Sequence, residues 1–414
     1  MKRIFAFLAA ALGLLSAHAL DVTNVTARQR WPWNNLVDVD FILTTNGTEK
    51  SSAFSVDITG TYSNGTKTAV AATFVTATEA VAGTNRVTWN LGADYPGQRI
   101  ADLSLTVTAS EQPDYLVIDL SGGPTAPSYP IRYSAQPPNV SSDACRTSEL
   151  WLRRIPAGTF TMGSPGSEVG RAPTENQVSV TLSKGFYIGI FEVTQQQWYN
   201  VMGTKPSYFN NTDCWSSRPV EQVSYNAIRG ALNGTNWPAS SAVDALSFIG
   251  KLRARTCGTD AFDLPTAAQW ESACRAKTTT ALYNNANLTN AMSDANVALL
   301  ARYAFSSDVP NVTYMSQNCG ITNGSAKVGS YLPNAWGLYD MLGNELEWCL
   351  DWYEPTVTGG TDPKGPVSSS TGERVRRGGS YDSPASSNRS AFRWRQFPYN
   401  SAPTYGFRLA KNQP

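Results

Sequence analysis

The stretch PNAWGLYDMLGNELEW, residues 333–348, contains three acidic residues, Asp340, Glu345 and Glu347. Its second half offers both carboxylate and backbone carbonyl oxygens. A hard cation such as Ca²⁺ binds oxygen ligands of these two kinds, so the stretch is compatible with a calcium site. The alternative is that Glu347 only accepts hydrogen bonds from loop amides that follow Gly343 and Asn344.

Six further phrases surround this stretch in a fixed order. They are IPAGTFTMGS (155–164), KGFYIGIFEVTQQQW (184–198), PVEQVSY (219–225), LPTAAQWESACRA (264–276), RRGGSY (376–381) and GFRLA (406–410). Together with 333–348, they closely resemble the formylglycine-generating enzyme family, also called the sulfatase-modifying factor family. One phrase would be a weak signal, but seven phrases in order are specific. The resemblance covers about residues 151–411.

The resemblance implies an α+β fold that is related to C-type lectins, rich in ordered loops and poor in regular secondary structure. Active members of the family oxidise a cysteine in a Cys-x-Pro-x-Arg segment of a client sulfatase to formylglycine. They use molecular oxygen, and several use copper(I) held by two active-site cysteines. Calcium supports the fold of the family, and its site maps here onto the Asp340 side chain, the Gly343 and Glu345 carbonyls and the Glu347 side chain.

The family's two active-site cysteines map onto Ser383 and Asn388, three and eight residues after the Gly-Gly-Ser. Copper(I) selects soft thiolates, so copper is not expected at these positions. The family's active-site serine is retained as Ser380, and Leu346 stands where active members commonly carry tryptophan. These positions therefore lack the thiols that the family's chemistry uses, and no residue is assigned as catalytic.

Two other cysteines, Cys274 and Cys349, are candidates to replace the missing thiols. Both lie in phrases that many family members share for packing or disulfides. A reactive thiol needs an exposed, electropositive setting, so rescue by either cysteine is disfavoured.

Residues 1–19, MKRIFAFLAAALGLLSAHA, have the basic start, apolar run and small-x-small end of a signal peptide, which predicts an exported protein in the periplasm, at the cell surface or secreted. No membrane span is expected after cleavage. Cleavage removes His18, the only histidine of the chain, which excludes Ser-His-Asp and Cys-His nucleophiles and histidine-bound metals. It leaves 31 basic and 32 acidic residues, a balance that implies neither a nucleic-acid nor a membrane-surface partner.

Six cysteines in an exported chain allow up to three disulfides in fifteen connectivities. They are Cys145, Cys214, Cys257, Cys274, Cys319 and Cys349, and the spacing does not decide the pairing. No C-x-x-C pair occurs, which argues against a thiolate zinc site or a thioredoxin-like site.

The chain preceding the family region predicts a separate antiparallel β-sandwich over residues 20–120. Apolar residues alternate with polar ones at 37–43 and 103–109, the pattern of half-buried strands. Trp31, Trp33 and Trp89 are interpreted as packing residues. Residues 121–150 contain five prolines and are predicted to be a semi-rigid connector.

Three helices are predicted in the family region. Thr194 with Gln197, and Thr266 with Gln269, have the spacing of capping boxes, the first helix ending at Gly203. A third helix is expected over about 241–257, with Val243, Leu246, Ile249 and Leu252 on its buried face.

The segment 374–395, RVRRGGSYDSPASSNRSAFRWR, is rich in arginine. Five arginines belong to the family pattern and are expected to make scaffold ion pairs and hydrogen bonds to loop carbonyls: Arg376, Arg377, Arg389, Arg393 and Arg408. The remaining Tyr, Ser, Asn and Trp residues up to Tyr405 have the composition of a paratope, in which rigid aromatic rings combine with adaptable polar groups. Tyr381, Asp382, Trp394 and Tyr399 are the predicted ligand-binding residues, although an ordinary polar loop is the alternative.

Three functions stay open at this point. The first is an exported family member that binds a peptide, glycan or protein ligand without oxidising it, which the missing thiols favour. The second is a formylglycine-generating oxidase with an atypical site, and the third is a structural surface protein.

Overall fold

The structure is a computed structural model of the chain. It describes residues 20–30, 35–45, 54–63, 65–71, 74, 79–98, 100, 102–111 and 113–412, the last range with gaps at 211–212, 233, 257–261 and 307–323. The predicted signal peptide, Trp31 and Trp33 lie outside the described residues. The chain divides into a first unit that ends at Pro113 and a second that begins at Asp114. Among the described helices, none has both the length and the apolar character needed to cross a bilayer.

The first unit contains two antiparallel sheets. One has the order β1-β2-β6, and in the other β3 pairs with β4, β5 and β7. The elements are β1 (Asp21–Gln29), β2 (Leu36–Thr44), β3 (Phe54–Tyr62), β4 (Lys67–Val70), β5 (Glu79–Ala80), β6 (Gly83–Asn90), α1 (Leu91–Asp94) and β7 (Ser104–Glu111). Apolar side chains of both sheets form one hydrophobic cluster that includes Val39, Ile58 and the fully buried Trp89. The predicted packing role of Trp89 and the alternation at 37–43 are thereby confirmed.

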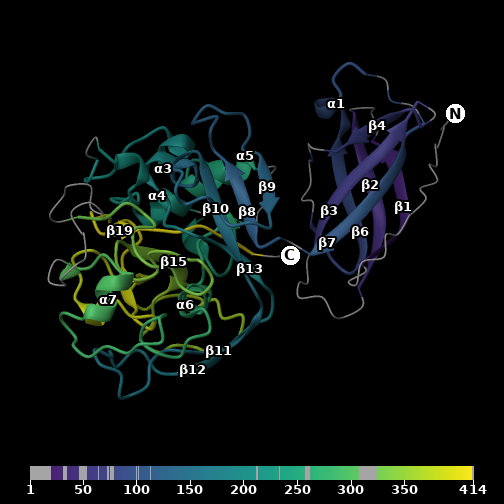
Figure 1. Cartoon of the computed structure of the whole chain (residues 1–414). Helices are drawn as coiled ribbons and strands as arrows, with labels where there is room; N and C mark the ends of the chain where they lie inside the picture. The colour runs from purple at the N-terminus through teal and green to yellow at the C-terminus, as the bar shows by residue number, and fades with distance from the viewer. Residues whose placement is uncertain are drawn as a thin grey trace. The chain divides into compact units, whose positions relative to one another are not determined.

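The second unit is built on a six-stranded sheet of order β14-β20-β13-β10-β8-β9 (Figure 1). Its strands are β8 (Tyr115–Asp119), β9 (Ile131–Ser134), β10 (Glu149–Ile155), β13 (Phe186–Gly189), β14 (Phe262–Asp263) and β20 (Ala410–Asn412). Successive side chains of a strand point to opposite faces. Accordingly, Leu116 and Ile118 pack on one face and Val117 on the other.

Helices cover both faces of this sheet. Leu116 and Ile118 share their cluster with residues of α3 (Gln195–Met202), α4 (Tyr225–Arg229) and α5 (Phe248–Arg255), whereas Val117 shares its cluster with α6 (Ala267–Arg275) and α7 (Ala295–Leu300). The remaining short helices are α2 (Ala144–Thr147) and the 3-10 turns η1 (Trp215–Ser217), η2 (Gly234–Asn236) and η4 (Ala385–Ser387).

Two smaller sheets complete the second unit. The first has the order β11-β12-β16, formed by β11 (Gly158–Met162), β12 (Val178–Leu182) and β16 (Gly360–Thr361). The second has the order β18-β17-β15-β19, formed by β15 (Leu346–Trp352), β17 (Arg374–Arg377), β18 (Trp394–Gln396) and β19 (Tyr405–Gly406). The second sheet carries the predicted site residues, because the loops between its strands contain 378–393 and 397–404.

The predicted boundary between the units is wrong by several residues. The strand at 115–119, placed in the first domain from sequence, pairs with β10 of the second unit. The predicted connector 121–150 contains β9, which pairs with β8, and α2. Prolines occur on both sides of β9, but β9 itself still forms ladder hydrogen bonds with β8.

Two of the three predicted helices are confirmed with their caps. Both Thr194–Gln197 and Thr266–Gln269 form complete capping boxes, and Gly203 ends α3 in the left-handed conformation. The third helix starts later than predicted. Its N-cap is Ser247, whose hydroxyl accepts from the Gly250 amide, so Leu246 is left outside the helix and 80% exposed.

The five arginines predicted to have a scaffold role form an interior framework of the second unit. Arg377 pairs with Glu271, Arg408 with Glu347, and Arg389 with Glu168 and Glu175. Arg376 and Arg393 donate to carbonyls of the loops. All five are buried, which confirms the scaffold role that the sequence predicted.

Arg389 offers a direct test of this framework. Arg389→Met leaves the carboxylates of Glu168 and Glu175 buried without their cation, and removing one partner of a buried ion pair destabilises strongly. We expect the free energy of unfolding in urea to fall by about 3–5 kcal/mol. The matched control is Arg395→Met, which removes an ion pair to Glu373 on the surface and is expected to change stability by less than about 1 kcal/mol. Equal effects of the two variants would show that the buried pairs are not the framework.

Candidate functional site

Two glycines position the loop that carries the family's active-site positions. Gly378 and Gly379 follow β17 with φ angles of 94° and 77°, a region that L-residues rarely adopt. A Cβ on Gly379 would lie 2.5 Å from Asn388 Oδ1 and 2.6 Å from the Ser387 carbonyl oxygen. Only glycine therefore allows the chain to turn back closely enough to bring Ser380 next to the segment 383–388.

The loop brings the predicted positions Ser380, Ser383 and Asn388 together. The Ser380 and Ser383 hydroxyl oxygens are 2.7 Å apart, and Asn388 Nδ2 donates to the Ser383 and Pro384 carbonyls at 3.3 and 2.8 Å. Ser380 Oγ also donates to Asp382 Oδ1 at 2.7 Å. Hydroxyl and amide groups at these positions can bind a polar ligand, but they have no thiol that could hold copper(I) or be oxidised.

The other thiols that the structure describes do not replace them. Cys145, Cys274 and Cys349 are free and buried. Burial raises the pKa of the Cys274 thiol to about 12 and that of Cys349 well above its ordinary value, so both remain protonated thiols. With these three cysteines free, at most one intramolecular disulfide is left for the other three, below the limit of three that the cysteine count allows.

Tyr381 is not an exposed contact residue. Its side chain is only 6% exposed, and its ring packs edge-on against Phe209 at a centroid distance of 5.4 Å. Phe209 in turn contacts Tyr208 edge-on at 5.0 Å, and the Tyr208 side chain is 66% exposed. The three rings form a path from the surface to the interior, and Tyr208 is a surface residue of this path that sequence reasoning missed.

Buried carboxylates lie near Tyr381. Both carboxylate oxygens of Glu345 and one of Glu221 are buried and make no hydrogen bond within the described part of the chain. Burial, followed by the charges of Glu345, Asp382 and Glu221, raises the pKa of Tyr381. Burial likewise raises the pKa of Glu345 well above its ordinary value, with Glu221 and Glu192 adding to the effect. The PVEQVSY phrase contained Glu221, but nothing in its spacing showed that the carboxylate would be buried here.

The predicted calcium ligands fit the ion only in part. Asp340 Oδ2 accepts from the Gly329 amide at 2.6 Å, and its Oδ1 is buried without a hydrogen-bond partner among the described residues, which suits a cation ligand. Glu347 does not suit one, because its carboxylate accepts from Arg408 at 2.6 and 2.7 Å and from the Trp270 indole at 2.6 Å. Gly343 and Glu345, whose carbonyls are the other two predicted ligands, are buried. In the described residues, no group of three or more His, Cys, Asp or Glu side chains is arranged to hold a metal, so calcium binding stays a prediction.

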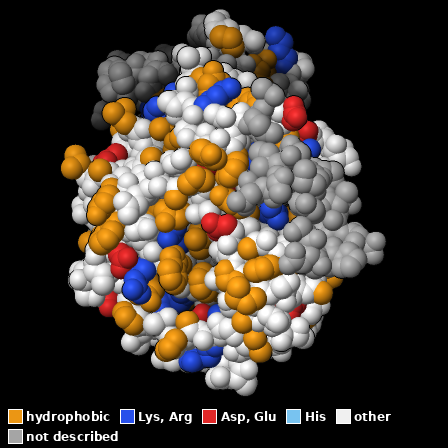
Figure 2. All heavy atoms as spheres, turned by 90° about the vertical axis from the view of Figure 1, so that its left-hand side faces the viewer, with side chains coloured by type: hydrophobic (Ala, Val, Ile, Leu, Met, Phe, Trp, Pro, Cys, Tyr) orange, Lys and Arg blue, Asp and Glu red, His pale blue; other side chains and the backbone are white. Residues whose placement is uncertain are grey.

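Three aromatic side chains of the C-terminal segment are exposed. Trp394 is 52% exposed and stacks on Phe392, and Tyr399, 65% exposed, stacks on Phe397 at 5.4 Å. The loop holding Tyr399 is fixed, because Pro398 O accepts from the Asn226 amide and Ala402 O from the Gln222 amide. Figure 2 shows groups of hydrophobic side chains on one face of the second unit, with Lys, Arg, Asp and Glu side chains between them. The predicted residues Asp382, Trp394 and Tyr399 are thus available to a ligand.

The buried Glu221 predicts a pH dependence of stability. Burial raises its pKa from 4.5 to about 7, although the Phe209 amide donates to its Oε1 at 2.8 Å. The folded state therefore favours the protonated acid, whose contribution is full below pH 4.5 and is lost as the pH rises through about 7. Glu221→Gln keeps an acceptor for the amide and removes the charge. We expect it to stabilise the protein on the order of 2 kcal/mol above neutral pH and much less in mild acid, measured by urea unfolding at both pH values.

The control for this measurement is Asp57→Asn, which removes an exposed carboxylate of the first unit. It is expected to leave the pH dependence unchanged. A Glu221→Gln variant with the pH profile of the wild type would show that Glu221 stays ionised in the folded protein.

Comparisons with known proteins identify the family. Residues 139–413 match the family described as "Sulfatase-modifying factor enzyme 1-like domain". The formylglycine-generating enzyme of Mus musculus is 29% identical over 322 residues, covering 67% of this chain and 80% of the mouse protein. The serine/threonine-protein kinase pkn1 of Chlamydia pneumoniae is 28% identical over 273 residues, 62% of this chain and 37% of that protein. The solved structure of Treponema denticola variable protein 1 is 26% identical, with a TM-score of 0.49, and the match covers 64% of this chain and 96% of that one. The family predicted from seven ordered phrases is therefore confirmed: the chain belongs to the sulfatase-modifying factor enzyme 1-like family.

Proposed function

We propose that this protein is an exported family member that binds a peptide, glycan or protein ligand and does not generate formylglycine. The observation that carries the proposal is the pair Ser383 and Asn388, which occupy the family's cysteine positions and contact each other there. A relation of the second unit to C-type lectins, known as ligand-binding folds, is part of the same proposal. So is a supporting calcium ion near Asp340.

The absence of a suitable thiol among the described residues supports a non-oxidising role. Oxidation of a cysteine by molecular oxygen in this family requires a thiol that can bind copper(I) or form a disulfide with the substrate. Ser383 and Asn388 offer an alcohol and an amide, and the buried Cys274 contacts Ser390 Oγ at 3.5 Å from inside the core. Its raised pKa keeps it protonated.

The ligand surface is formed by the exposed side chains Asp382, Trp394, Phe397 and Tyr399. Stacked, hydrogen-bonded aromatic groups offer contact area at a low loss of conformational entropy, as in antibody paratopes. Asn400 reinforces this arrangement, since its Nδ2 donates to Gln396 Oε1 at 2.9 Å and its amide donates to Phe397 O. The surface is therefore preorganised for contact.

The first test is the family's own reaction. A Cys-x-Pro-x-Arg peptide is incubated with the protein, copper(I), oxygen and a thiol reductant, and aldehyde formation is followed by mass spectrometry. We expect no conversion beside a cysteine-containing family member as positive control. Conversion by the wild-type protein would refute the non-oxidising role and require an atypical oxidase site.

The complementary variant restores both thiols. Ser383→Cys with Asn388→Cys places two sulfurs in the loop where the Asn388 side chain already contacts the Ser383 backbone. Copper(I) binding by this variant, measured by competition with a chromophoric chelator, is expected to exceed that of the wild type. The single variant Ser383→Cys is the matched control, because one thiol binds copper(I) more weakly than two.

The second test concerns the ligand surface. Peptides are selected on the wild-type protein from a phage-displayed random library, and their affinities are compared with those for the Trp394→Ala and Tyr399→Ala variants. We expect at least tenfold weaker binding, because exposed aromatic anchors dominate interface energies. The free energy of unfolding is expected to change by less than about 1 kcal/mol, since both side chains are exposed.

Leu246→Ala removes an exposed apolar side chain elsewhere and serves as the control. Selected peptides that bind both aromatic variants as tightly as the wild type would place recognition elsewhere. Failure to select any peptide or to bind any glycan on an array would favour a structural role.

A further inference from the structure

The second unit contains a cavity whose lining residues all lie outside the 380–388 loop. It has a volume of about 400 Å³, which is within the range of small-molecule sites. We call it the Trp352 pocket. Nine residues line it: Thr235, Asn236, Ala239, Ser240, Trp352, Val367, Ser368, Ser369 and Gly372.

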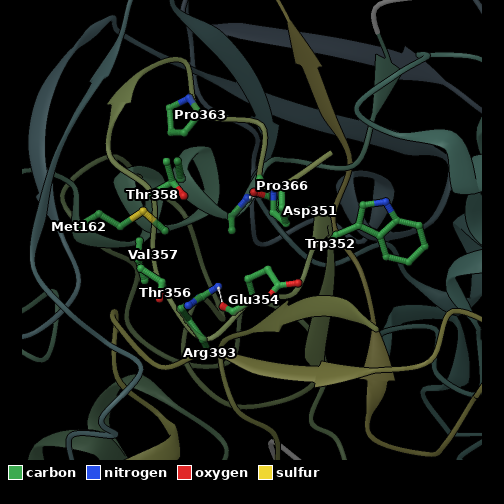
Figure 3. Close-up of a pocket in the computed structure, with 13 residues that line it drawn as sticks. Met162, Asp351, Trp352, Glu354, Thr356, Val357, Thr358, Pro363, Pro366 and Arg393 are labelled. Atoms are coloured by element: carbon green, nitrogen blue, oxygen red, sulfur yellow. Dashed lines mark hydrogen bonds between the residues drawn. The ribbon is translucent and has the colours of Figure 1, made fainter. Parts of the chain in front are cut away.

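Trp352 reaches this pocket because strand β15 ends there. Asp351 and Trp352 are consecutive on β15, so their side chains leave the strand in different directions. Figure 3 shows Asp351 beside Pro366 in a small neighbouring cavity, whereas the Trp352 indole projects away from that group. The neighbouring cavity has a volume of only about 30 Å³, so it is too small for an organic ligand.

Arg374 fixes the indole and the opposite wall of the pocket at once. Its guanidinium carbon lies 3.3 Å from the centroid of the Trp352 ring, and it pairs with Trp352 across β15 and β17. The same guanidinium donates to the Trp237 carbonyl at 3.2 Å and to the Thr235 carbonyl, both in or next to η2. Arg374 is fully buried, so its position does not depend on solvent. The aromatic ring and the η2 wall are therefore held in a fixed geometry.

Several polar groups of the pocket have no hydrogen-bond partner among the residues that the structure describes. The Trp352 indole N–H, the Asn236 side-chain amide and the Ser368 hydroxyl make no hydrogen bond within the described residues, and Asn236 and Ser368 are exposed. Ser369 is different, because its hydroxyl donates to the Tyr353 carbonyl and accepts from the Thr371 and Gly372 amides. Ser369 thus shapes the far wall, while Asn236, Ser368 and Trp352 remain available to a ligand.

The charge of the pocket restricts the class of ligand. None of its nine lining residues is ionisable, so neither a carboxylate nor an ammonium group would find a counter-charge. An aromatic ring beside free hydroxyl, amide and N–H groups suits a molecule that has an apolar C–H face and a rim of hydroxyl groups. A neutral sugar ring has both features and is small enough for the volume.

We propose that the Trp352 pocket binds a neutral hexose residue, which stacks on the Trp352 indole and hydrogen-bonds Asn236 and Ser368. This site is separate from the proposed 382–399 ligand surface and does not depend on it. It adds a saccharide specificity that the family's active-site loop does not provide.

Saturation-transfer NMR on the full chain tests the proposal. The probes are the methyl glycosides of glucose, galactose, mannose and N-acetylglucosamine. We expect saturation transfer to the ring C–H protons of at least one of them, with a dissociation constant in the millimolar range typical of a few contacts. Asn236→Ala and Trp352→Phe are each expected to weaken binding about three- to tenfold, the effect of one lost hydrogen bond.

Both substitutions spare the framework. Asn236 is exposed, and phenylalanine keeps an aromatic ring for Arg374 to stack on. Tyr399→Ala, on the other surface, is the matched control and is expected to bind the glycoside as the wild type does.

Two results would overturn the proposal. One is the absence of transfer to all four neutral glycosides by the folded protein. The other is an affinity that Asn236→Ala and Trp352→Phe leave unchanged, which would place the sugar elsewhere. Loss of glycoside binding in the Tyr399→Ala variant alone would also place the sugar outside the Trp352 pocket and overturn the proposal.

Discussion

The Arg408 guanidinium holds together parts of the second unit that are far apart in the sequence. It is fully buried and donates to both carboxylate oxygens of Glu347 on β15, to the Gly189 carbonyl at the end of β13, and to the Tyr339 and Asp340 carbonyls. A buried ion pair alone gives little net stability, because desolvation offsets the attraction. Here the guanidinium also satisfies three loop carbonyls, so it replaces the secondary structure that these loops lack. Burial raises the pKa of neighbouring Asp340 to about 6 despite the presence of Arg408.

The same principle explains how loops can carry a fixed site. The segment 378–393 contains only the short turn η4, yet Arg377 donates to the carbonyls of Ser390, Ala391 and Phe392, and Arg389 donates to Ser386 O and Gly170 O. These bonds define where Ser383 and Asn388 meet. None of these arginines depends on the side chains of Ser383 or Asn388, so the chemistry at these two positions can change without removing the interactions that hold the loop. The proposed binding role relies on this separation of scaffold from chemistry.

Much of this arrangement could be predicted from sequence, for identifiable reasons. The capping boxes at Thr194 and Thr266 are local, since each involves groups three residues apart. The ordered phrases around 333–348 identified the family and the role of the arginines. The start of α5 was missed because apolar spacing favoured Val243 and Leu246, whereas the Ser247 hydroxyl caps the helix later. The boundary at residue 113 was missed because the composition of the strand at 115–119 is compatible with either unit. Only the pairing of this strand with β10 assigns it to the second unit.

The site residues that sequence reasoning misplaced all depend on contacts between distant segments. Tyr381 has a paratope-like neighbourhood in sequence, but Phe209, 172 positions earlier, covers its ring. Trp352 was not singled out at all, because its exposure to a pocket depends on Arg374 and on the η2 wall. In both cases a contact between distant segments, with Phe209 for Tyr381 and with Arg374 for Trp352, decides whether an aromatic side chain supports the core or faces a ligand. Composition alone cannot distinguish these outcomes. In a fold stabilised mainly by contacts between loops, the buried framework determines which side chains are accessible to a ligand.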